Sequence, residues 1–508
     1  MSHPVPTPPN PSTPTAQAAL PARSAWALVA LPAALPTAFP TALSAALVAT
    51  LAGCAHAPAP PAEPPAPLPA AFKEADPRWT TLAPAEAQPR GAWWRVFGDP
   101  LLDRLAERAA LQHTDIATAR ARLAQAQALL RSAQAGGGVQ AALSGGLSRQ
   151  GGPLLNAAGS AGTLATLGGS LSAELDLSGR LADGVEAAQR DAQSRAALLQ
   201  TATLQVQAEL AQTYLALRAV DAELALARRQ AQGWADGLRI AQARLAAGTL
   251  AERELLRLRA EATAAEAELP PLVRQRALLE HALALLVGEP ASGFSLAPLA
   301  DAAAPSAAWP ALPQVPPGIP STVLARRADV AAAQQALAAA QSRRGAAEAA
   351  WFPNLLLTAS GGQASPSLAG LFSVAARAWG VGALLTLPLV DGGRHQAVLA
   401  QADAEVEALR AQHRAQVLGA FREVEDQLVR LRTLADEAEA QARALALAAQ
   451  AQALAERRWR QGSLARLDWL DAGRDALRLQ RRQLQLRAAQ AQATVGLIRA
   501  LGGGWGDG

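Results

Sequence analysis

Two long stretches of the chain carry apolar side chains at alternating intervals of four and three residues. In residues 394–461 the stripe includes Val417, Phe421, Val424, Leu428 and Leu431, and in residues 180–247 it includes Val206, Leu210, Thr213, Leu217, Val220 and Leu224. This spacing is the seam of a coiled coil, and neither stretch contains proline. We therefore expect two uninterrupted helices, each on the order of 100 Å long. Many seam positions are alanine, which lets neighbouring helices approach closely.

In four shorter segments, at about 139–148, 169–177, 354–361 and 380–388, apolar residues and glycine recur at every second position, and most of the positions between them are polar or small. This alternation over about ten residues is typical of a transmembrane β-strand, although amphipathic hairpins on a soluble domain would show it too. Glu174 and Asp176 lie on the polar face of the second segment, which favours a water-filled barrel lumen. Four strands cannot close a barrel, and open edges are not tolerated in lipid. The pattern therefore requires several copies of the chain.

The chain contains two copies of one sequence repeat. Glycine, arginine and acidic residues recur at a constant separation of 214 positions, which an alanine-rich composition does not produce by chance. These pairs are Asp115/Asp329, Gly179/Gly393, Arg180/Arg394, Glu209/Glu423, Gly248/Gly462 and Gly288/Gly502, and Leu123/Leu337 and Gln127/Gln341 have the same separation. Each unit has the order helix, two strands, long helix, helix. The shorter helices are expected at about 100–134, 251–287, 321–350 and 465–501, with Ser321 as the cap of the third.

The N-terminal region has the pattern of a membrane-targeting signal. Residues 41–53 are apolar and uncharged, too short to cross a bilayer but suited to the core of a signal peptide. Leu51-Ala52-Gly53-Cys54 resembles the bacterial lipobox, whose cysteine is acylated; the alternative is an incidental cysteine. Ala55 follows, whereas inner-membrane retention usually requires Asp there, so the outer membrane is the expected destination.

These patterns divide the chain into six segments. They are a signal peptide (1–53), a lipidated Pro/Ala-rich linker (54–97), the first repeat (98–288), a Pro-rich joint (289–320), the second repeat (321–502) and a C-terminal tail (503–508).

Composition excludes several other classes of protein. Half of the residues are hydrophobic but only 4% are aromatic, which suits closely packed helices better than a bulky globular core. The single cysteine rules out a disulfide framework and a multi-cysteine zinc site. The histidines form no cluster with metal-ligand spacing, and no nucleophile elbow, Walker A loop or nucleotide fingerprint is found. We therefore expect no enzyme activity, cofactor or metal. The net charge of +4 comes from arginines interleaved with acidic residues, which is weak evidence for nucleic-acid binding.

Several motifs, in this order, resemble the TolC-like outer-membrane efflux channel family in its lipoprotein (NodT-type) branch. They are Ala92-Trp93-Trp94 with Phe97 and Asp99-Pro100, Glu174 to Arg180, Leu269-Pro270-Pro271-Leu272, Gly318 to Ser321, Arg326 to Val330, and Trp351 to Leu355. The similarity extends over roughly residues 90–502.

The resemblance implies a mixed α/β membrane protein. Three chains, each with four strands, would form a 12-stranded β-barrel in the outer membrane, continued by a periplasmic α-barrel of coiled coils. It also implies a passive duct for substrates delivered by an inner-membrane efflux transporter and a periplasmic adaptor. One alternative is the outer-membrane channel of a type I protein secretion system. Another is the coiled-coil adaptor itself, which would have one helical hairpin flanked by β-rich domains.

The same resemblance assigns a gate at the helix-to-helix turns. By position, Asp468 and Asp471 match constriction acids, Leu467 a hydrophobic constriction residue and Arg474 a gate-bracing arginine, while Glu254 takes the place of an acid that bridges neighbouring helices. Threefold symmetry would turn each carboxylate into a ring that favours cations. The alternative is that these residues are solvated charges on a helix face.

The turns themselves match the family's adaptor-contacting tips. These segments are Gly248-Thr249-Leu250 and Gly462-Ser463-Leu464, in which glycine allows the tight turn. The sequence departs from the family at Trp459, where tyrosine is common, and at Leu464, where some members carry arginine. Tryptophan offers only an N–H donor, so this position lacks the hydroxyl on which a tyrosine latch depends.

Overall fold

The computed structural model describes residues 71–74, 91–150, 162–298, 315 and 326–503. The chain divides into two units, Met1–Ala55 and His56–Gly508, and all described residues belong to the second. The signal segment, Cys54 and Ser321 therefore lie outside the described residues.

Two long helices organise the structure, as the 4–3 spacing predicts. Helix α4 spans Arg180–Ala246 and helix α9 spans Arg394–Arg460, and each contains 67 residues. Both begin directly after a glycine in the left-handed conformation, Gly179 with φ 82° and Gly393 with φ 88°. The seam residues Val424, Leu428 and Leu431 are buried. The repeat in the sequence is thus a repeat in the structure, with helices of equal length at equivalent positions.

Each long helix is followed by helical structure that runs back along it. Helix α9 is followed by one continuous helix, α10 (Arg466–Ala500). Helix α4 is followed by α5 (Glu252–Ala267) and α6 (Leu269–Leu286). The prediction of a single helix over 251–287 is therefore wrong. Two prolines occupy the first turn of α6, where they cannot donate to a preceding turn. The equivalent part of α10 contains no proline and continues unbroken.

The two remaining helical segments also differ from the expectation. In place of one helix over 100–134 there are α2 (Pro100–Gln112) and α3 (Thr114–Gly136), separated by His113 in an extended conformation. The His113 Nδ1 accepts from the Asp115 N–H at 3.1 Å and so caps α3. Helix α8 spans Ala328–Ala349, and its N-cap is Arg327 rather than Ser321.

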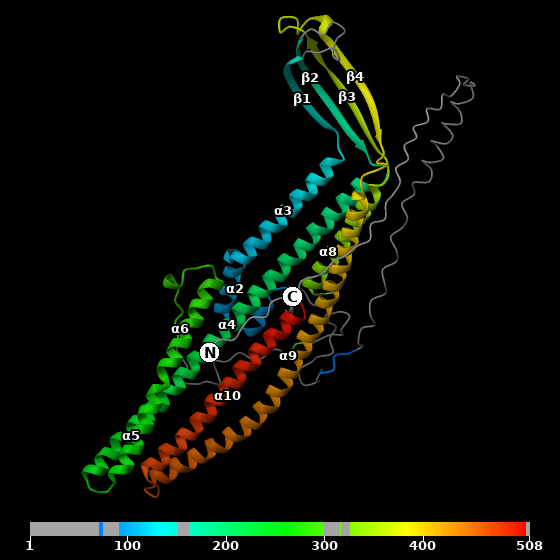
Figure 1. Ribbon diagram of the computed structural model, residues 1–508. Coiled ribbons are helices and arrows are strands. Elements are labelled where there is room, and N and C mark those ends of the chain that lie inside the picture. Colours follow the sequence, from blue (N-terminus) through cyan, green and yellow to red (C-terminus); the bar gives the residue numbers. More distant parts are fainter. Residues whose placement is uncertain (1–70, 75–90, 151–161, 299–314, 316–325, 504–508) are drawn as a thin grey trace, which may run out of the picture. The chain divides into compact units, whose positions relative to one another are not determined.

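Four strands form one antiparallel sheet in the order β1-β2-β3-β4 (Figure 1). They are β1 (Gln140–Gln150), β2 (Gly162–Leu175), β3 (Asn354–Ser365) and β4 (Arg377–Thr386). The second strand, predicted over 169–177, begins earlier, at Gly162, and also ends earlier, at Leu175. Just beyond its end, the Asp176 carboxylate accepts from the Ala182 N–H of α4 at 2.8 Å. The β2–β3 pairing joins the two repeats into one sheet.

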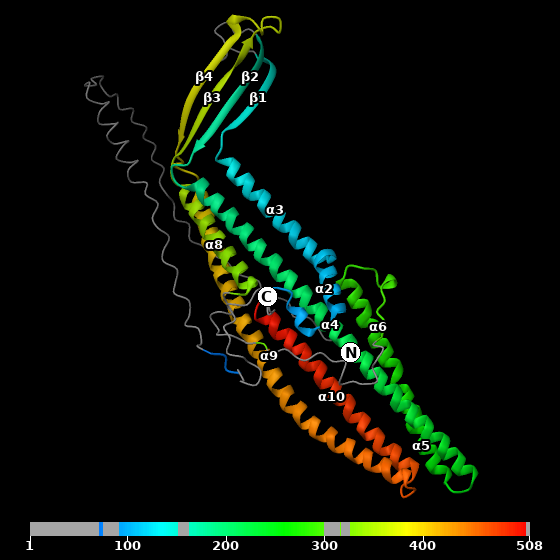
Figure 2. The same cartoon turned by 180° about the vertical axis from the view of Figure 1, so that it is seen from behind.

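The largest core lies where helices of both repeats meet around α4. This helix packs against α3, α8, α10, α5 and α6, and α9 packs against α8 and α10 (Figure 2). The 3-10 helix η2 (Trp93–Phe97) contributes three aromatic side chains to the core. Trp93, Tyr214, Leu217 and Ile498 are almost wholly buried. None of the helices in the described part of the chain carries an apolar run that could cross a bilayer.

Candidate functional site

The two helix-to-helix turns are structural copies of each other. Gly248 has φ 69° and Gly462 has φ 74°, so each supplies the left-handed residue that ends a helix. The Thr249 and Ser463 N–H groups donate to the Arg244 and Arg458 carbonyls, each at 2.9 Å. The hydroxyls of the same two residues donate to the same carbonyls at 3.1 Å. The predicted segments ending at Leu250 and Leu464 are thus two tight turns of one design, both largely solvent-exposed.

Each turn closes a hairpin, and the two hairpins meet through α4 and α10. Hairpin 1 consists of α4, α5 and α6, and hairpin 2 consists of α9 and α10. Near the turns the contact passes over Gly237, which is buried on α4. An added Cβ there would lie 3.5 Å from Leu470 Cδ1 and 3.8 Å from Leu467 Cδ2. The predicted constriction residue Leu467 thus packs partly into the seam between hairpins.

Arg474 lies in the same seam. Its guanidinium carbon is 3.4 Å from the centre of the Trp234 ring on α4, and its Nε donates to the Leu470 carbonyl at 3.2 Å. It also pairs with Asp471 one turn away on its own helix. Only 10% of the Arg474 side chain is exposed, against 54% for Asp471. Burial and repulsion from Arg257 lower the pKa of Arg474, although Asp471 opposes this shift.

The first repeat has its own ion pair at this level. Glu254 accepts from Arg257 Nε at 3.0 Å and from Nη2 at 2.7 Å, which lowers the pKa of Glu254. Glu254 and Arg257 are the repeat equivalents of Asp468 and Asp471, so an arginine in one copy replaces an acid in the other. The Asp471 carboxylate stabilises the charge of Arg257 across the seam. Asp468 is exposed in the first turn of α10.

The sequence marks Trp459 as a departure from the family but does not indicate what the tryptophans of this region contact. Trp459 and Trp469 stack within hairpin 2, with ring centroids 4.7 Å apart and planes at 11°. The Arg466 guanidinium carbon lies 5.5 Å from the Trp459 ring centre. Trp459 therefore acts here through its ring. Trp234 was not singled out at all, and the available signal was its place on the α4 seam three residues before Gly237.

Glu174 and Asp176 lie at the other end of α4, next to the sheet. Glu174 pairs with Arg180 at 2.5 Å, and Asp176 bonds the first turn of α4. Both side chains thus order the junction between strand and helix, and the lumen role remains a prediction. No cluster of three or more metal-ligating residues occurs in the part of the chain that the structure describes.

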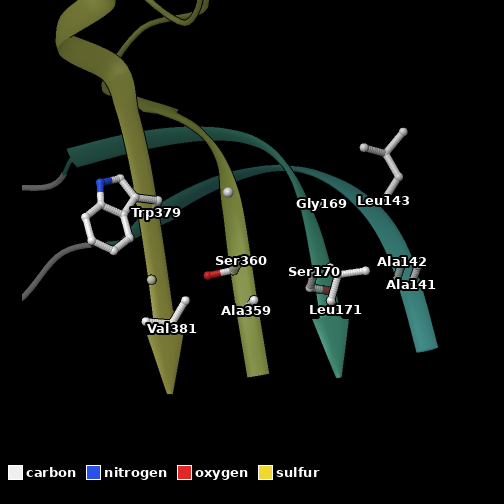
Figure 3. A pocket seen from close by; sticks show the side chains of 12 residues that line it. Ala141, Ala142, Leu143, Gly169, Ser170, Leu171, Ala359, Ser360, Trp379 and Val381 are labelled. Carbon is white, nitrogen blue, oxygen red and sulfur yellow. The ribbon is translucent and has the colours of Figure 1, made fainter. Parts of the chain in front are cut away.

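The sheet presents an apolar face to its surroundings. The register places Leu171 opposite Ala141 and Ala359, and Ala359 opposite Val381. The next set of partners is Leu143, Gly169, Gly361 and Trp379. These residues line a shallow hollow, in which Leu143 and Trp379 stand on the two edge strands (Figure 3) and Gly169 and Gly361 lie between them. Trp379 and Leu143 are more than four-fifths exposed in the single chain. Such a face suits burial in lipid.

A two-repeat chain with long helical hairpins and an exposed apolar sheet belongs to the class of outer-membrane channel subunits. Residues 105–289 and 319–503 each match the model of the outer membrane efflux protein family. The chain is a member of that family, and the two matches coincide with the two repeats.

Named relatives align with most of the chain. The pyoverdine export outer membrane protein OpmQ of Pseudomonas putida is 33% identical over 435 residues, covering 84% of this chain and 90% of the relative. The outer membrane protein OprJ of Pseudomonas aeruginosa is 32% identical over 335 residues, covering 66% and 69%.

Solved structures agree with the fold. The outer-membrane channel OprN superposes with a TM-score of 0.77 at 27% identity, covering 88% of this chain and 99% of that one. The open state of the MtrE outer membrane channel of Neisseria gonorrhoeae superposes with a TM-score of 0.75 at 26% identity, covering 88% and 98%.

Proposed function

We propose that this chain is the exit duct of a tripartite efflux pump. It is an outer-membrane efflux channel protein, and the family consists of channels rather than enzymes. The observation that carries the finer proposal is the four-stranded sheet, whose edge strands β1 and β4 have no partner strand within the described chain. Unpaired edges are not tolerated in lipid, so copies of the chain must close the sheet. Three copies would form a 12-stranded barrel, which lies within the known range of strand numbers.

The cargo that we propose is small organic molecules. The relatives are named for pyoverdine export and toluene efflux, and these names support a small solute rather than a protein. An inner-membrane transporter would load the duct through a periplasmic adaptor. The surfaces offered to that adaptor are the two turns, 248–250 and 462–464, because they are exposed and lie at the end of the hairpins away from the sheet (Figure 1).

The proposed gate lies just behind these turns. In a trimer, Leu467, Asp468, Asp471 and Glu254 would each occur three times around one axis, and the three acidic residues would give rings of charge that favour cations. Arg474 would hold the closed arrangement through its contacts in the seam. We also propose the order of segments given in the sequence analysis and the acylation of Cys54. The lipid on Cys54 and the β-barrel would then both lie in the outer membrane.

Single-channel recording in planar bilayers tests this function. The purified protein should form pores of low conductance, and Arg474→Ala should increase the conductance because the seam contacts are lost. Asp471→Ala should have a smaller effect, since it removes the attraction to Arg257 while the Trp234 contact remains. Arg478→Ala is the matched control, because Arg478 pairs with Asp475 on the exposed side of the same helix at 3.3 Å. Unchanged conductance in both gate variants would reject the gate assignment.

A further inference from the structure

The ion pair at the proposed gate does not by itself connect the two hairpins. Asp471 and Arg474 lie three residues apart on α10, so both move together with that helix. If hairpin 2 moves away from hairpin 1, their pairing survives the movement. The resistance to opening must therefore come from groups on opposite sides of the seam.

The contact that does cross the seam at Arg474 is the one with Trp234. A guanidinium carbon 3.4 Å from a ring centre is face-on contact distance, and tryptophan is the ring that attracts cations most strongly. Burial of Arg474 removes the water that would otherwise compete for its charge. The long-range attraction between Arg257 and Asp471 also crosses the seam, but Asp471 is mostly exposed and its field is screened by salt.

A second set of contacts ties the hairpins further from the turns. Arg481, two helical turns beyond Arg474, bonds Glu223 of α4 at 2.5 Å and Glu268 at 2.5 Å. Glu268 is the residue between α5 and α6, so Arg481 holds the break of hairpin 1 against α10. The end of the hairpins nearest the turns can therefore separate while this deeper connection remains, provided that Arg474 leaves the Trp234 ring.

We propose that Trp234 is the positioning residue of the gate: its ring on α4 is the seat that holds Arg474, and with it hairpin 2, in the closed arrangement. This inference rests on the proposed channel function and goes beyond the charged residues assigned from the family pattern. It places the closing contact between the two repeats of one chain, in the form of a cation on an aromatic face.

The test is single-channel recording of the full-length protein with five variants, one of which is Arg474→Ala alone. Trp234→Ala should raise the open-to-closed ratio about tenfold, as expected from losing a desolvated cation–π contact. Trp234→Phe should stay near wild type, because a ring face is retained. Trp234→Ala combined with Arg474→Ala should be no more open than Arg474→Ala alone, since both changes break one contact. Trp459→Ala is the matched control, because its ring stacks within hairpin 2 and leaves the seam intact.

The possible outcomes distinguish a failure of the Trp234–Arg474 proposal from a failure of the proposed channel function. A wild-type open-to-closed ratio in Trp234→Ala, or opening that adds fully to that of Arg474→Ala, would overturn the proposed role of the Trp234–Arg474 contact. Equal opening in Trp459→Ala would overturn it too, because any loss of tip packing would then suffice. If no variant forms pores at all while the protein remains assembled and inserted, the proposed channel function itself fails. Thermal unfolding of Trp234→Phe and Trp234→Ala shows whether a change in gating follows from the contact or from damaged folding.

Discussion

The ring of Phe72 packs against the ring of Phe421 on α9, with centroids 6.3 Å apart. The backbone N–H groups of Lys73 and Glu74 then donate to the two oxygens of Glu425 at 2.8 and 3.0 Å. Arg432, two turns further on, pairs with Glu74 at 2.7 Å. A short segment far from α9 in the sequence is therefore attached to it by one aromatic contact, one ion pair and one carboxylate that accepts two backbone donors.

Replacing Glu425 by Ala should release this segment. Both N–H groups lose a charged acceptor, so we expect their protection from hydrogen exchange to fall about tenfold or more. Hydrogen-exchange mass spectrometry of the peptide containing residues 71–74 measures this directly. Asp426→Ala, which removes the exposed neighbouring carboxylate, should leave the peptide protected. Equal exchange in both variants would mean that Glu425 does not hold the segment.

Asp221 should be among the residues most sensitive to substitution. Its side chain is 1% exposed and accepts from Arg276 Nε at 2.7 Å and from Arg218 Nη1 at 3.1 Å. Asp221→Ala leaves two largely buried arginines without this partner, so we expect it to lower the free energy of unfolding by about 3–5 kcal/mol. Asp236→Ala breaks a more exposed pair with Arg239 and should cost less than about 1 kcal/mol. Urea unfolding of the detergent-solubilised protein compares them, and similar losses would contradict the prediction.

Gly288 should tolerate a methyl group less well than Gly248, although both have positive φ. At Gly288 an added Cβ would lie 2.8 Å from the Gln112 carbonyl oxygen, whereas at Gly248 it meets open space. Gly248→Ala should therefore cost only the backbone strain, about 1–2 kcal/mol. Gly288→Ala should cost about 1–3 kcal/mol more because of the clash. Melting temperatures of the two variants provide the comparison, and equal values would show that Gln112 moves aside freely.

The stability that Asp329 contributes to the fold should be lost in acid. Burial by itself raises the pKa of Asp329, but hydrogen bonds from Arg327, at 2.6 and 3.0 Å, outweigh burial and hold the pKa below its ordinary value. A lowered pKa means that the charged form stabilises the fold above the unfolded pKa of about 3.9, and that this contribution is lost as the pH falls through the folded pKa. The difference in unfolding free energy between wild type and Asp329→Asn should therefore shrink below about pH 4. A difference that is independent of pH would contradict the assignment.

Cys54 should carry the lipid if the proposed anchor is correct. Mass spectrometry of the mature N-terminal peptide should then find acyl chains on this residue, and Cys54→Ser should lack them. Cys54 is the only cysteine, so no other thiol in the chain competes for the label. A mature protein with an unmodified cysteine would reject the anchor.

Much of the helical architecture follows from the sequence alone. The 4–3 stripe and the constant repeat separation locate α4 and α9 to within a residue at each end. The break at His113 could not be predicted, because histidine is not a helix breaker and acts here through a cap on Asp115. The break before α6 has a visible signal, the proline pair Pro270-Pro271, but prolines are also tolerated in the first turn of a helix, so the pair alone does not show whether the helix ends there.

Part of the candidate site could likewise be predicted from the sequence, and part could not. Asp471 and Arg474 could be placed on one helix face from their spacing, and their pairing needs only local geometry. The partner on the other hairpin could not be found, because the stripe does not specify how α4 is rotated against α10. The contact between Trp234 and Arg474 can therefore be recognised only in the structure, where the rotation of α4 against α10 is fixed.

The equal length of α4 and α9 restricts how the gene for this protein can change. Inserting one residue in either helix would move its turn by about 1.5 Å and rotate everything beyond it by about 100°. The two turns would then no longer end at one level, and Arg474 would no longer face the ring of Trp234. An insertion in one long helix therefore has to be matched by an insertion in the other. The two repeats can diverge in sequence, but their long helices have to change length together.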